Sequence, residues 1–178
     1  GTEEAIREGF PNVIFIHDHV LLDQAFACLL AREHLQNDEE LIIGCCDNGM
    51  VMDLEKFAHK RKSNDVLMIS HSGDENIAQN PNAHSWAKLS KCGNRIDYVS
   101  IKQTVSKDYM RDHATTGMFW FKRSSDFLKN LELMLSDGND ITERKVLDGV
   151  LNYCIQSGAK TSFIDVRYVC WGTPADYE

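Results

Sequence analysis

Residues 44–50 read G-C-C-D-N-G-M and follow the apolar run Leu41–Ile43. A short buried strand that leads into an aspartate and an Asn-Gly turn would carry Asp47 at its carboxyl end, where open α/β sheets bind their ligands. A carboxylate is a hard oxygen ligand and suits a Mg²⁺ ion that also holds phosphate. The same residue could instead cap a turn or the next helix. Asp47 is therefore a candidate metal ligand that needs support from other parts of the chain.

Three further stretches supply that support. They read Q-A-F-A-C-L-L-A from Gln24, T-T-G-M-F-W-F-K from Thr115, and W-G-T-P-A-D-Y from Trp171. In this order and spacing, together with the D-N-G that begins at Asp47, they resemble the sugar-1-phosphate nucleotidyltransferases, also called NDP-sugar pyrophosphorylases. The likeness covers roughly residues 10–178. No one motif is specific, but four in order are a specific signal.

The resemblance implies an α/β fold, a three-layer α/β/α sandwich around a mixed, mainly parallel sheet. It also implies a reaction in which a sugar-1-phosphate oxygen attacks the α-phosphate of a nucleoside triphosphate, giving an NDP-sugar and pyrophosphate. Such chemistry requires alignment of the reactants and neutralisation of the developing charge. The implied cofactor is Mg²⁺, and the implied partners are the nucleoside triphosphate and the sugar-1-phosphate.

Two positions would carry the chemistry under this resemblance. Asp47 matches the family's metal aspartate, and Lys102 matches the lysine that contacts the sugar phosphate. Lys102 could equally be a strand-end lysine that faces water. Thr116 and Gly117 match the turn that approaches the sugar ring, since a glycine lets backbone come close to a ligand. Gly117 could instead mark a strand bulge.

Four more substrate-binding residues are implied by the same motifs. Asn48 and Gly49 complete the D-N-G turn, and Gln24 matches the glutamine of a T-x-G-Q-A motif near the nucleotide. Glu143 resembles a sugar-binding glutamate that stands ahead of an N-x-x-I-x-x-G run. A capping role at the start of a helix is the alternative for Glu143.

The chain also departs from the family pattern. Cys170 takes the place of the aspartate in D-x-G-T, and a thiol is a poor ligand for Mg²⁺. Ile101 takes the place of a glutamate, and no glycine-rich G-x-G-x-R loop is present. We therefore expect a single domain over 1–178 that lacks its N-terminal βα portion and the end of its C-terminal helix. The alternatives are a non-catalytic relative that binds a nucleotide sugar or has a regulatory role, and a nucleotide-sugar-dependent glycosyltransferase, for which D-x-D would be usual.

Composition limits the class of protein. The 178 residues suffice for one domain with a core, and 43% hydrophobic and 26% charged residues are ordinary for a globular chain. A net charge of −8 argues against nucleic acid as a partner. No apolar run reaches the ~20 residues of a membrane span, and no signal peptide is visible. The six cysteines contain no C-x-x-C and favour a reducing, cytoplasmic location, with a homo-oligomer left open.

Apolar periodicity predicts the order of the elements. Strands and helices alternate with short links in the first part of the chain, which is typical of parallel βαβ units. A hairpin around 91–94 and two polar loops, over 73–83 and 104–114, are expected in the middle. The predicted strands cover 13–16, 41–44, 66–70, 84–89, 95–101, 116–121 and 161–166, and the predicted helices cover 23–35, 53–60, 124–135 and 142–158, with another beginning at Pro174.

Overall fold

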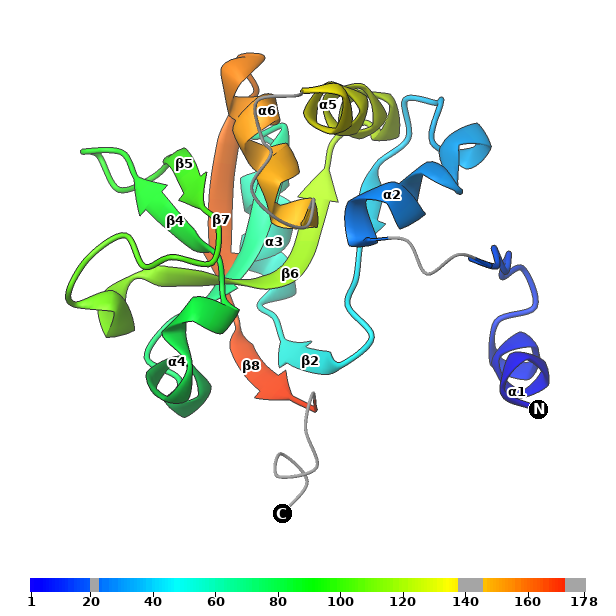
Figure 1. The fold of residues 1–178 in the computed structure, drawn as a ribbon, viewed down its shortest axis with the longest axis horizontal. Coiled ribbons are helices and arrows are strands. Elements are labelled where there is room, and N and C mark those ends of the chain that lie inside the picture. The colour runs from blue at the N-terminus through cyan, green and yellow to red at the C-terminus, as the bar shows by residue number, and fades with distance from the viewer. Residues whose placement is uncertain (20–22, 138–145, 172–178) are drawn as a thin grey trace.

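A six-stranded mixed sheet forms the centre of the computed structural model, which describes residues 1–19, 23–137 and 146–171 (Figure 1). The strand order is β5-β4-β6-β3-β7, and β1 also pairs with β6. The two remaining strands, β2 and β8, form a separate two-stranded ribbon. The strands are β1 (Leu41–Ile43), β2 (Asn48–Val51), β3 (Val66–His71), β4 (Trp86–Leu89), β5 (Ile96–Ser100), β6 (His113–Phe121), β7 (Thr161–Asp165) and β8 (Arg167–Cys170).

The helices are short apart from one. They are α1 (Thr2–Gly9), α2 (Gln24–Leu29), α3 (Leu54–Arg61), α4 (Glu75–Gln79), α5 (Ser124–Ser136) and α6 (Val150–Gln156), with 3-10 turns at Arg32–His34, Pro81–Ala83, Tyr109–Arg111 and Leu147–Gly149. The Asp53 carboxylate caps α3 by accepting a hydrogen bond from Lys56 N at 2.9 Å. In the described part of the chain, no helix is long and apolar enough to cross a membrane.

Helices cover both faces of the sheet, so the α/β/α sandwich is confirmed (Figure 1). On one face, Val66 and Met68 of β3 belong to the main core cluster together with apolar residues of α5 and α6. On the other face, the Trp120 ring meets the Phe57 ring of α3 edge-on, with 6.2 Å between the ring centroids. The two contacts lie on opposite faces because successive side chains of a strand point to opposite faces of the sheet.

The expectation of a mainly parallel sheet is wrong, because most neighbouring strands pair antiparallel. Only β3 and β7 pair in parallel among the described strands. The nine-residue strand β6 runs antiparallel to β1, β3 and β4, and β4 and β5 form the predicted hairpin. β6 lies between β1 and β3 although it follows both in the chain. Its insertion separates two strands that sequential βαβ units would have made neighbours.

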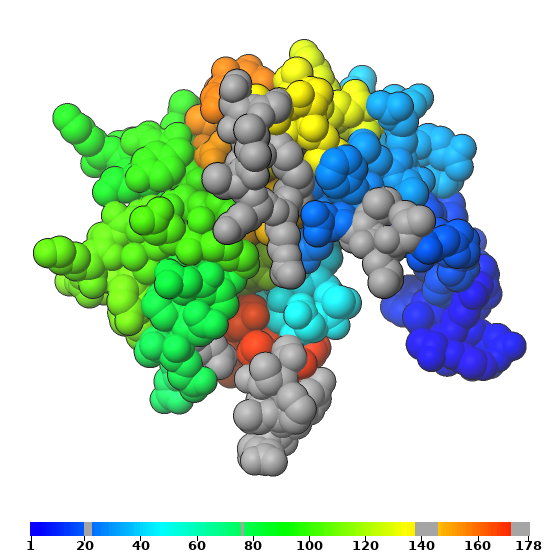
Figure 2. All heavy atoms as spheres, viewed as in Figure 1, coloured from blue at the N-terminus to red at the C-terminus, as the bar shows by residue number. Residues whose placement is uncertain are grey.

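The N-terminal part also departs from expectation. No strand forms over residues 13–16, where Ile14 and Ile16 are 62% and 42% exposed and no described strand pairs with them. Helix α1 buries no residue and stands at one side of the molecule (dark blue in Figure 2). The helix predicted over 23–35 ends earlier, as α2 and a 3-10 turn.

Two segments that the sequence predicted as a loop and a turn contain regular secondary structure. Residues 73–83, expected as a loop, contain α4 and a 3-10 turn. The Asn48–Gly49 pair lies in β2, which pairs antiparallel with β8. The beginning of the helix predicted over 142–158 and the helix predicted from Pro174 lie outside the described residues, whereas α6 lies within the former span.

Candidate active site

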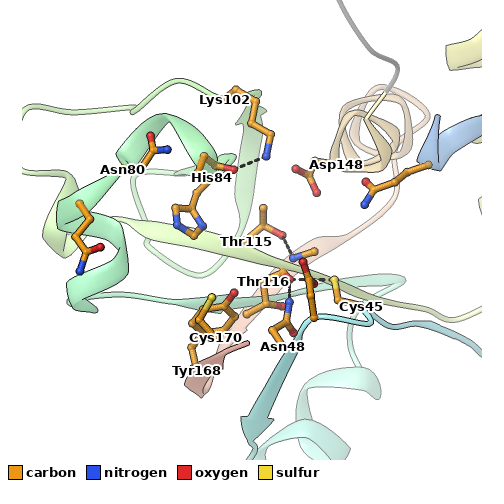
Figure 3. Close-up of a pocket in the computed structure, with 15 residues that line it drawn as sticks. Cys45, Asn48, Asn80, His84, Lys102, Thr115, Thr116, Asp148, Tyr168 and Cys170 are labelled. Carbon is orange, nitrogen blue, oxygen red and sulfur yellow. Dashed lines mark hydrogen bonds between the residues drawn. The ribbon is translucent and has the colours of Figure 1, made fainter. Parts of the chain in front are cut away.

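A cavity of about 390 Å³ opens where β1 leads into β2, beside the middle of β6 (Figure 3). One wall comes from α4 and the segment that follows it, and the opposite wall comes from the 3-10 turn before α6 and from α2. In Figure 2, residues of β8 (red) lie between α4 (green) and β2 (cyan). The lining residues are Gln24, Cys45, Asp47, Asn48, Gln79, Asn80, Ala83, His84, Lys102, Thr115, Thr116, Gly117, Asp148, Tyr168 and Cys170.

Polar and charged side chains predominate among the described residues of the lining. The lining contains four side-chain amides, two threonine hydroxyls, one lysine and two aspartates, and Ala83 is the sole aliphatic side chain. Pockets for apolar ligands are lined mainly by hydrophobic and aromatic groups. A lining with this many donors and acceptors, and with both signs of charge, suits a ligand that carries many hydroxyls and a charged group.

The turn that carries Asp47 is attached to β6. Cys45 Sγ and Asn48 Nδ2 both donate to the Thr116 carbonyl oxygen, at 3.2 and 3.0 Å. On the other side, Trp171 N donates to the Asp47 carbonyl oxygen at 2.9 Å. The Asp47 backbone is therefore fixed between β6 and the end of β8, while its side chain reaches the cavity.

Gly117 lies at an irregularity of β6. Between Thr115 and Phe119 the strand advances by four residues while β3 advances by two, from Ser70 to Met68. Gly117 adopts φ +80°, and a Cβ atom there would approach Cys45 Sγ to 2.6 Å. Gly117 N donates to Thr115 Oγ1 at 2.9 Å. The two interpretations of Gly117 are thus compatible, because it forms a bulge and also lines the cavity.

Lys102 lies at the exposed rim of the cavity, just after β5. Its φ of 54° is unusual for a residue other than glycine, and such backbone strain concentrates at functional sites. Lys102 N donates to Ser85 Oγ at 3.4 Å, and the ammonium group donates to the Ala83 carbonyl oxygen. The surrounding backbone thereby orients the ammonium group along the rim (Figure 3).

Asp148 is the buried charge of the cavity and is 8% exposed. It lies in the 3-10 turn before α6, and its carboxyl group points into the cavity on the side facing Lys102 (Figure 3). Burial raises the pKa of Asp148, whereas a hydrogen bond with Ser85 and the charge of Lys102 act in the opposite direction. Ser85 thus contacts both the backbone of Lys102 and the carboxyl group of Asp148.

Three aromatic rings pack together beside the cavity. The His71 ring stacks on Tyr168 with 4.2 Å between centroids and meets His84 edge-on at 5.2 Å. Burial, and secondarily the neighbouring His84, lower the pKa of His71 to about 4. Neither ring nitrogen of His71 has a hydrogen-bond partner within the described residues. His71 is therefore neutral near pH 7 and supports Tyr168 by stacking.

The donors near Asp47 suit a hard cation that is completed by substrate oxygens. Asn48 Oδ1 is buried and has no hydrogen-bond partner among the described residues, so this residue next to Asp47 in the sequence offers a second oxygen ligand. Mg²⁺ commonly binds one or two protein oxygens together with phosphate and water. The Cys170 thiol is an unsuitable ligand. Across the described ranges, no cluster of three or more His, Cys, Asp and Glu residues forms a self-sufficient metal site.

Six of the eight residues expected from the motifs line the cavity. They are Gln24, Asp47, Asn48, Lys102, Thr116 and Gly117. Gly49 does not: a Cβ atom there would come within 2.7 Å of the Trp171 ring, so this glycine makes room for Trp171. Glu143 lies outside the described residues.

Sequence reasoning missed several lining residues. Asp148, His84 and Tyr168 are the most informative of them. The one available signal for Asp148 is a charged residue inside the apolar run V-L-D-G-V-L. For His84 and Tyr168 no local pattern distinguishes a lining residue from an ordinary packed residue.

Solved structures match this chain in fold, although no family model and no curated protein matches it. The nucleoside-diphosphate-sugar pyrophosphorylase from Vibrio cholerae RC9 matches with a TM-score of 0.65 at 19% identity, over 86% of this chain and 62% of that chain. The inositol-1-phosphate CTP transferase from T. maritima matches with a TM-score of 0.67 at 16% identity, over 98% and 66%. HddC from Yersinia pseudotuberculosis complexed with GMP-PN matches with a TM-score of 0.58 at 14% identity, over 99% and 70%.

The chain spans less than two thirds of the length of the first two of these proteins. At these identities the likeness concerns the fold. It agrees with the resemblance that the motifs indicated, since the matched proteins include a nucleoside-diphosphate-sugar pyrophosphorylase and a CTP transferase. The chain has the fold of the NDP-sugar pyrophosphorylases and related nucleotidyltransferases.

Proposed function

We propose that this chain forms the sugar-phosphate-binding part of a nucleotidyltransferase that makes an NDP-sugar from a nucleoside triphosphate and a sugar-1-phosphate. The observation that carries the proposal is the convergence of Asp47, Lys102, Thr116 and Gly117 on one hydrophilic cavity. These residues come from three different parts of the chain. Their separate motif assignments did not require them to meet.

The proposed reaction forms one bond and breaks one. An oxygen of the sugar-1-phosphate attacks the α-phosphorus of the triphosphate, and the bond from that phosphorus to the β-phosphate oxygen breaks, releasing pyrophosphate. Neither proton nor electron needs a protein acceptor. The contribution of the protein is alignment and electrostatic stabilisation.

Each of these lining residues has a role in this proposal. The Lys102 ammonium group contacts the sugar phosphate and offsets its charge. The backbone at Thr116 and Gly117 approaches the sugar ring, where the missing Cβ of Gly117 leaves room. Asp47 and Asn48 Oδ1 would hold Mg²⁺ together with phosphate oxygens. When bound, the ion would supply neutralisation of phosphate charge.

A second candidate function is binding of a sugar phosphate or nucleotide sugar without catalysis. The observation that favours it is Cys170, which lines the cavity at the position where the family pattern has a second carboxylate. A thiol there leaves the metal with fewer hard ligands. Both candidates require a sugar-phosphate site, and turnover distinguishes them.

The proposal is tested by isothermal titration calorimetry of wild-type protein with α-D-glucose, α-D-galactose and α-D-mannose 1-phosphates, with and without Mg²⁺. Lys102→Met should weaken binding about ten- to a hundredfold, because a charge-assisted hydrogen bond contributes about 1.5–3 kcal/mol. Asp47→Asn should abolish the gain in affinity that Mg²⁺ gives to the wild type.

The matched control is Lys107→Met, because Lys107 is an exposed lysine on the polar segment after Lys102 and does not line the cavity. It should bind like the wild type. If the wild type binds none of the three sugar phosphates, or if Lys102→Met and Lys107→Met bind alike, the proposed site is wrong.

A further inference from the structure

We infer that Asp148 is the specificity-determining residue of this cavity and accepts hydrogen bonds from hydroxyl groups of the sugar ring. The inference rests on the proposed function, because it assigns the glycosyl end of the same cavity. It adds a residue that none of the motifs contains. It also separates the cavity into a phosphate end and a hydroxyl end.

Burial distinguishes Asp148 from the other charged lining residues. Asp47 and Lys102 are exposed at the rim, whereas Asp148 is 8% exposed. A carboxylate is costly to bury unless hydrogen bonds or an opposite charge compensate it. Ser85 supplies one hydrogen bond to Asp148, and a carboxylate has about four acceptor positions. No other hydrogen bond to this carboxyl group comes from the described residues, so its remaining acceptor positions on the cavity side can serve a ligand.

The sign of the charge identifies the part of the ligand that can lie against Asp148. A carboxylate repels phosphate, so the phosphate group belongs at the Lys102 rim and not beside Asp148. Sugar hydroxyls are neutral donors, and one carboxylate can accept from two of them. Because Asp148 and Lys102 face each other across the cavity (Figure 3), one molecule with a phosphate and a ring of hydroxyls can satisfy both.

The backbone around Asp148 is held in a fixed position. Asn152, four residues later, exchanges two hydrogen bonds with the backbone of Val99, which lies three residues before Lys102. The carboxylate is therefore positioned by the same contact that ties α6 to β5. A fixed acceptor discriminates sharply, since a ligand without the matching hydroxyl leaves the buried group unpaired.

A purely structural role for Asp148, as the partner of Ser85, is the rival explanation. Ser85 is fully buried, and its hydroxyl also accepts from Lys102 N at 3.4 Å. In that case, replacing the carboxylate would disturb Lys102 and weaken every phosphate-bearing ligand alike. If Asp148 instead binds sugar hydroxyls, replacing it should weaken the binding of sugar phosphates and leave the binding of inorganic phosphate unchanged.

The experiment compares wild type, Asp148→Asn and the control Asp97→Asn, since Asp97 is an exposed aspartate on β5. Affinities are measured calorimetrically, with Mg²⁺, for inorganic phosphate and for the tightest of the three hexose 1-phosphates together with its 2-deoxy and 3-deoxy analogues. We expect Asp148→Asn to bind the sugar phosphate about ten- to a hundredfold more weakly. Inorganic phosphate should bind no more weakly than to the wild type.

The deoxy analogues identify the hydroxyl. One deoxy analogue should bind the wild type more weakly than the parent sugar phosphate does. The same analogue and the parent should bind Asp148→Asn equally, because the variant has already lost that contact. Equal weakening of inorganic phosphate and sugar phosphate, or no weakening at all, would overturn the role of Asp148 while leaving the proposed function intact. If the wild type binds no sugar phosphate, the proposed function fails first and this inference fails with it.

Discussion

Asn152 forms hydrogen bonds with both backbone polar groups of Val99. Val99 N donates to Asn152 Oδ1 at 2.7 Å, and Asn152 Nδ2 donates to the Val99 carbonyl oxygen at 2.9 Å. Val99 is 2% exposed and belongs to β5, the strand at one end of the sheet order. The Asn152 side chain, which belongs to α6, thus completes the hydrogen bonding of an edge strand. It also ties Asp148 to the strand that leads to Lys102.

Asn152→Ala should therefore lower the free energy of unfolding by about 2–4 kcal/mol, because two buried backbone groups lose their partners. Urea unfolding followed by circular dichroism measures the change. Asn82→Ala, in an exposed 3-10 turn, is the matched control and should change stability by less than about 0.5 kcal/mol. Equal midpoints for the two variants would show that water replaces the Asn152 side chain.

Gly117→Ala should destabilise the protein through both strain and a clash. Gly117 has φ +80°, and an added Cβ atom would lie 2.6 Å from Cys45 Sγ. Gly93→Ala isolates the strain, because Gly93 has φ +72° but no atom within 4 Å of the added carbon. We expect Gly93→Ala to cost roughly 1 kcal/mol and Gly117→Ala clearly more.

A double variant tests the clash itself. Adding Cys45→Ala to Gly117→Ala should recover part of the lost stability, because the sulfur atom is the group that the added carbon meets. Thermal unfolding of the wild type, Gly93→Ala, Gly117→Ala and the double variant gives the comparison. An absence of recovery in the double variant would mean that backbone strain alone accounts for the effect.

Acid should destabilise the fold through His71. The pKa of His71 is about 4 in the fold and 6.5 in an ordinary environment. Between these values the unfolded chain binds more protons, so the free energy of unfolding falls as the pH decreases from 6.5 towards 4. The loss attributable to His71 is at most roughly 3 kcal/mol.

His71→Phe keeps a ring against Tyr168 and removes the two unpartnered nitrogens. Its stability should decline less between pH 7 and pH 4.5 than that of the wild type. Urea midpoints measured at several pH values test this. Parallel declines for the two proteins would assign the acid sensitivity to other groups, such as His84, whose pKa is also lowered by burial.

Local patterns predicted the elements whose cause is local. The Asp53 cap predicted the start of α3, and apolar periodicity predicted α5 and the strand β3 nearly to their ends. The position of β6 between β1 and β3 was not predictable, because it depends on which strands pair at long range. Residues 13–16 have a strand-like sequence, yet form no strand in the described structure.

The site follows the same division. Asp47 and Gly117 were predictable as lining residues, because each belongs to a short motif, D-N-G or T-T-G, that resembles the family pattern. Asp148 was not, because its importance depends on Ser85, 63 positions earlier, and on the location of Lys102. Neither relation leaves a mark in the residues next to Asp148. A buried charge becomes recognisable as a site residue only when its partners in space are known.

Turnover by these 178 residues alone should be negligible. A triphosphate needs oriented donors and cations along its β- and γ-phosphates, and this sequence contains no G-x-G-x-R loop. Losing such a donor typically costs ~10²–10³-fold in rate. A pyrophosphate-release assay over several triphosphate and sugar-1-phosphate pairs measures it. Robust turnover would mean that other residues of this chain hold the triphosphate.

The central claim is that one cavity binds a sugar phosphate with its phosphate at Lys102 and its ring at Gly117. The most direct measurement is a crystal structure of the chain with Mg²⁺ and the tightest-binding hexose 1-phosphate. We predict phosphate oxygens within hydrogen-bond distance of Lys102 Nζ, and ring hydroxyls facing the backbone of Gly117 and the carboxyl group of Asp148. A ligand bound outside this cavity, or bound inside it with its phosphate beside Asp148, would contradict the account.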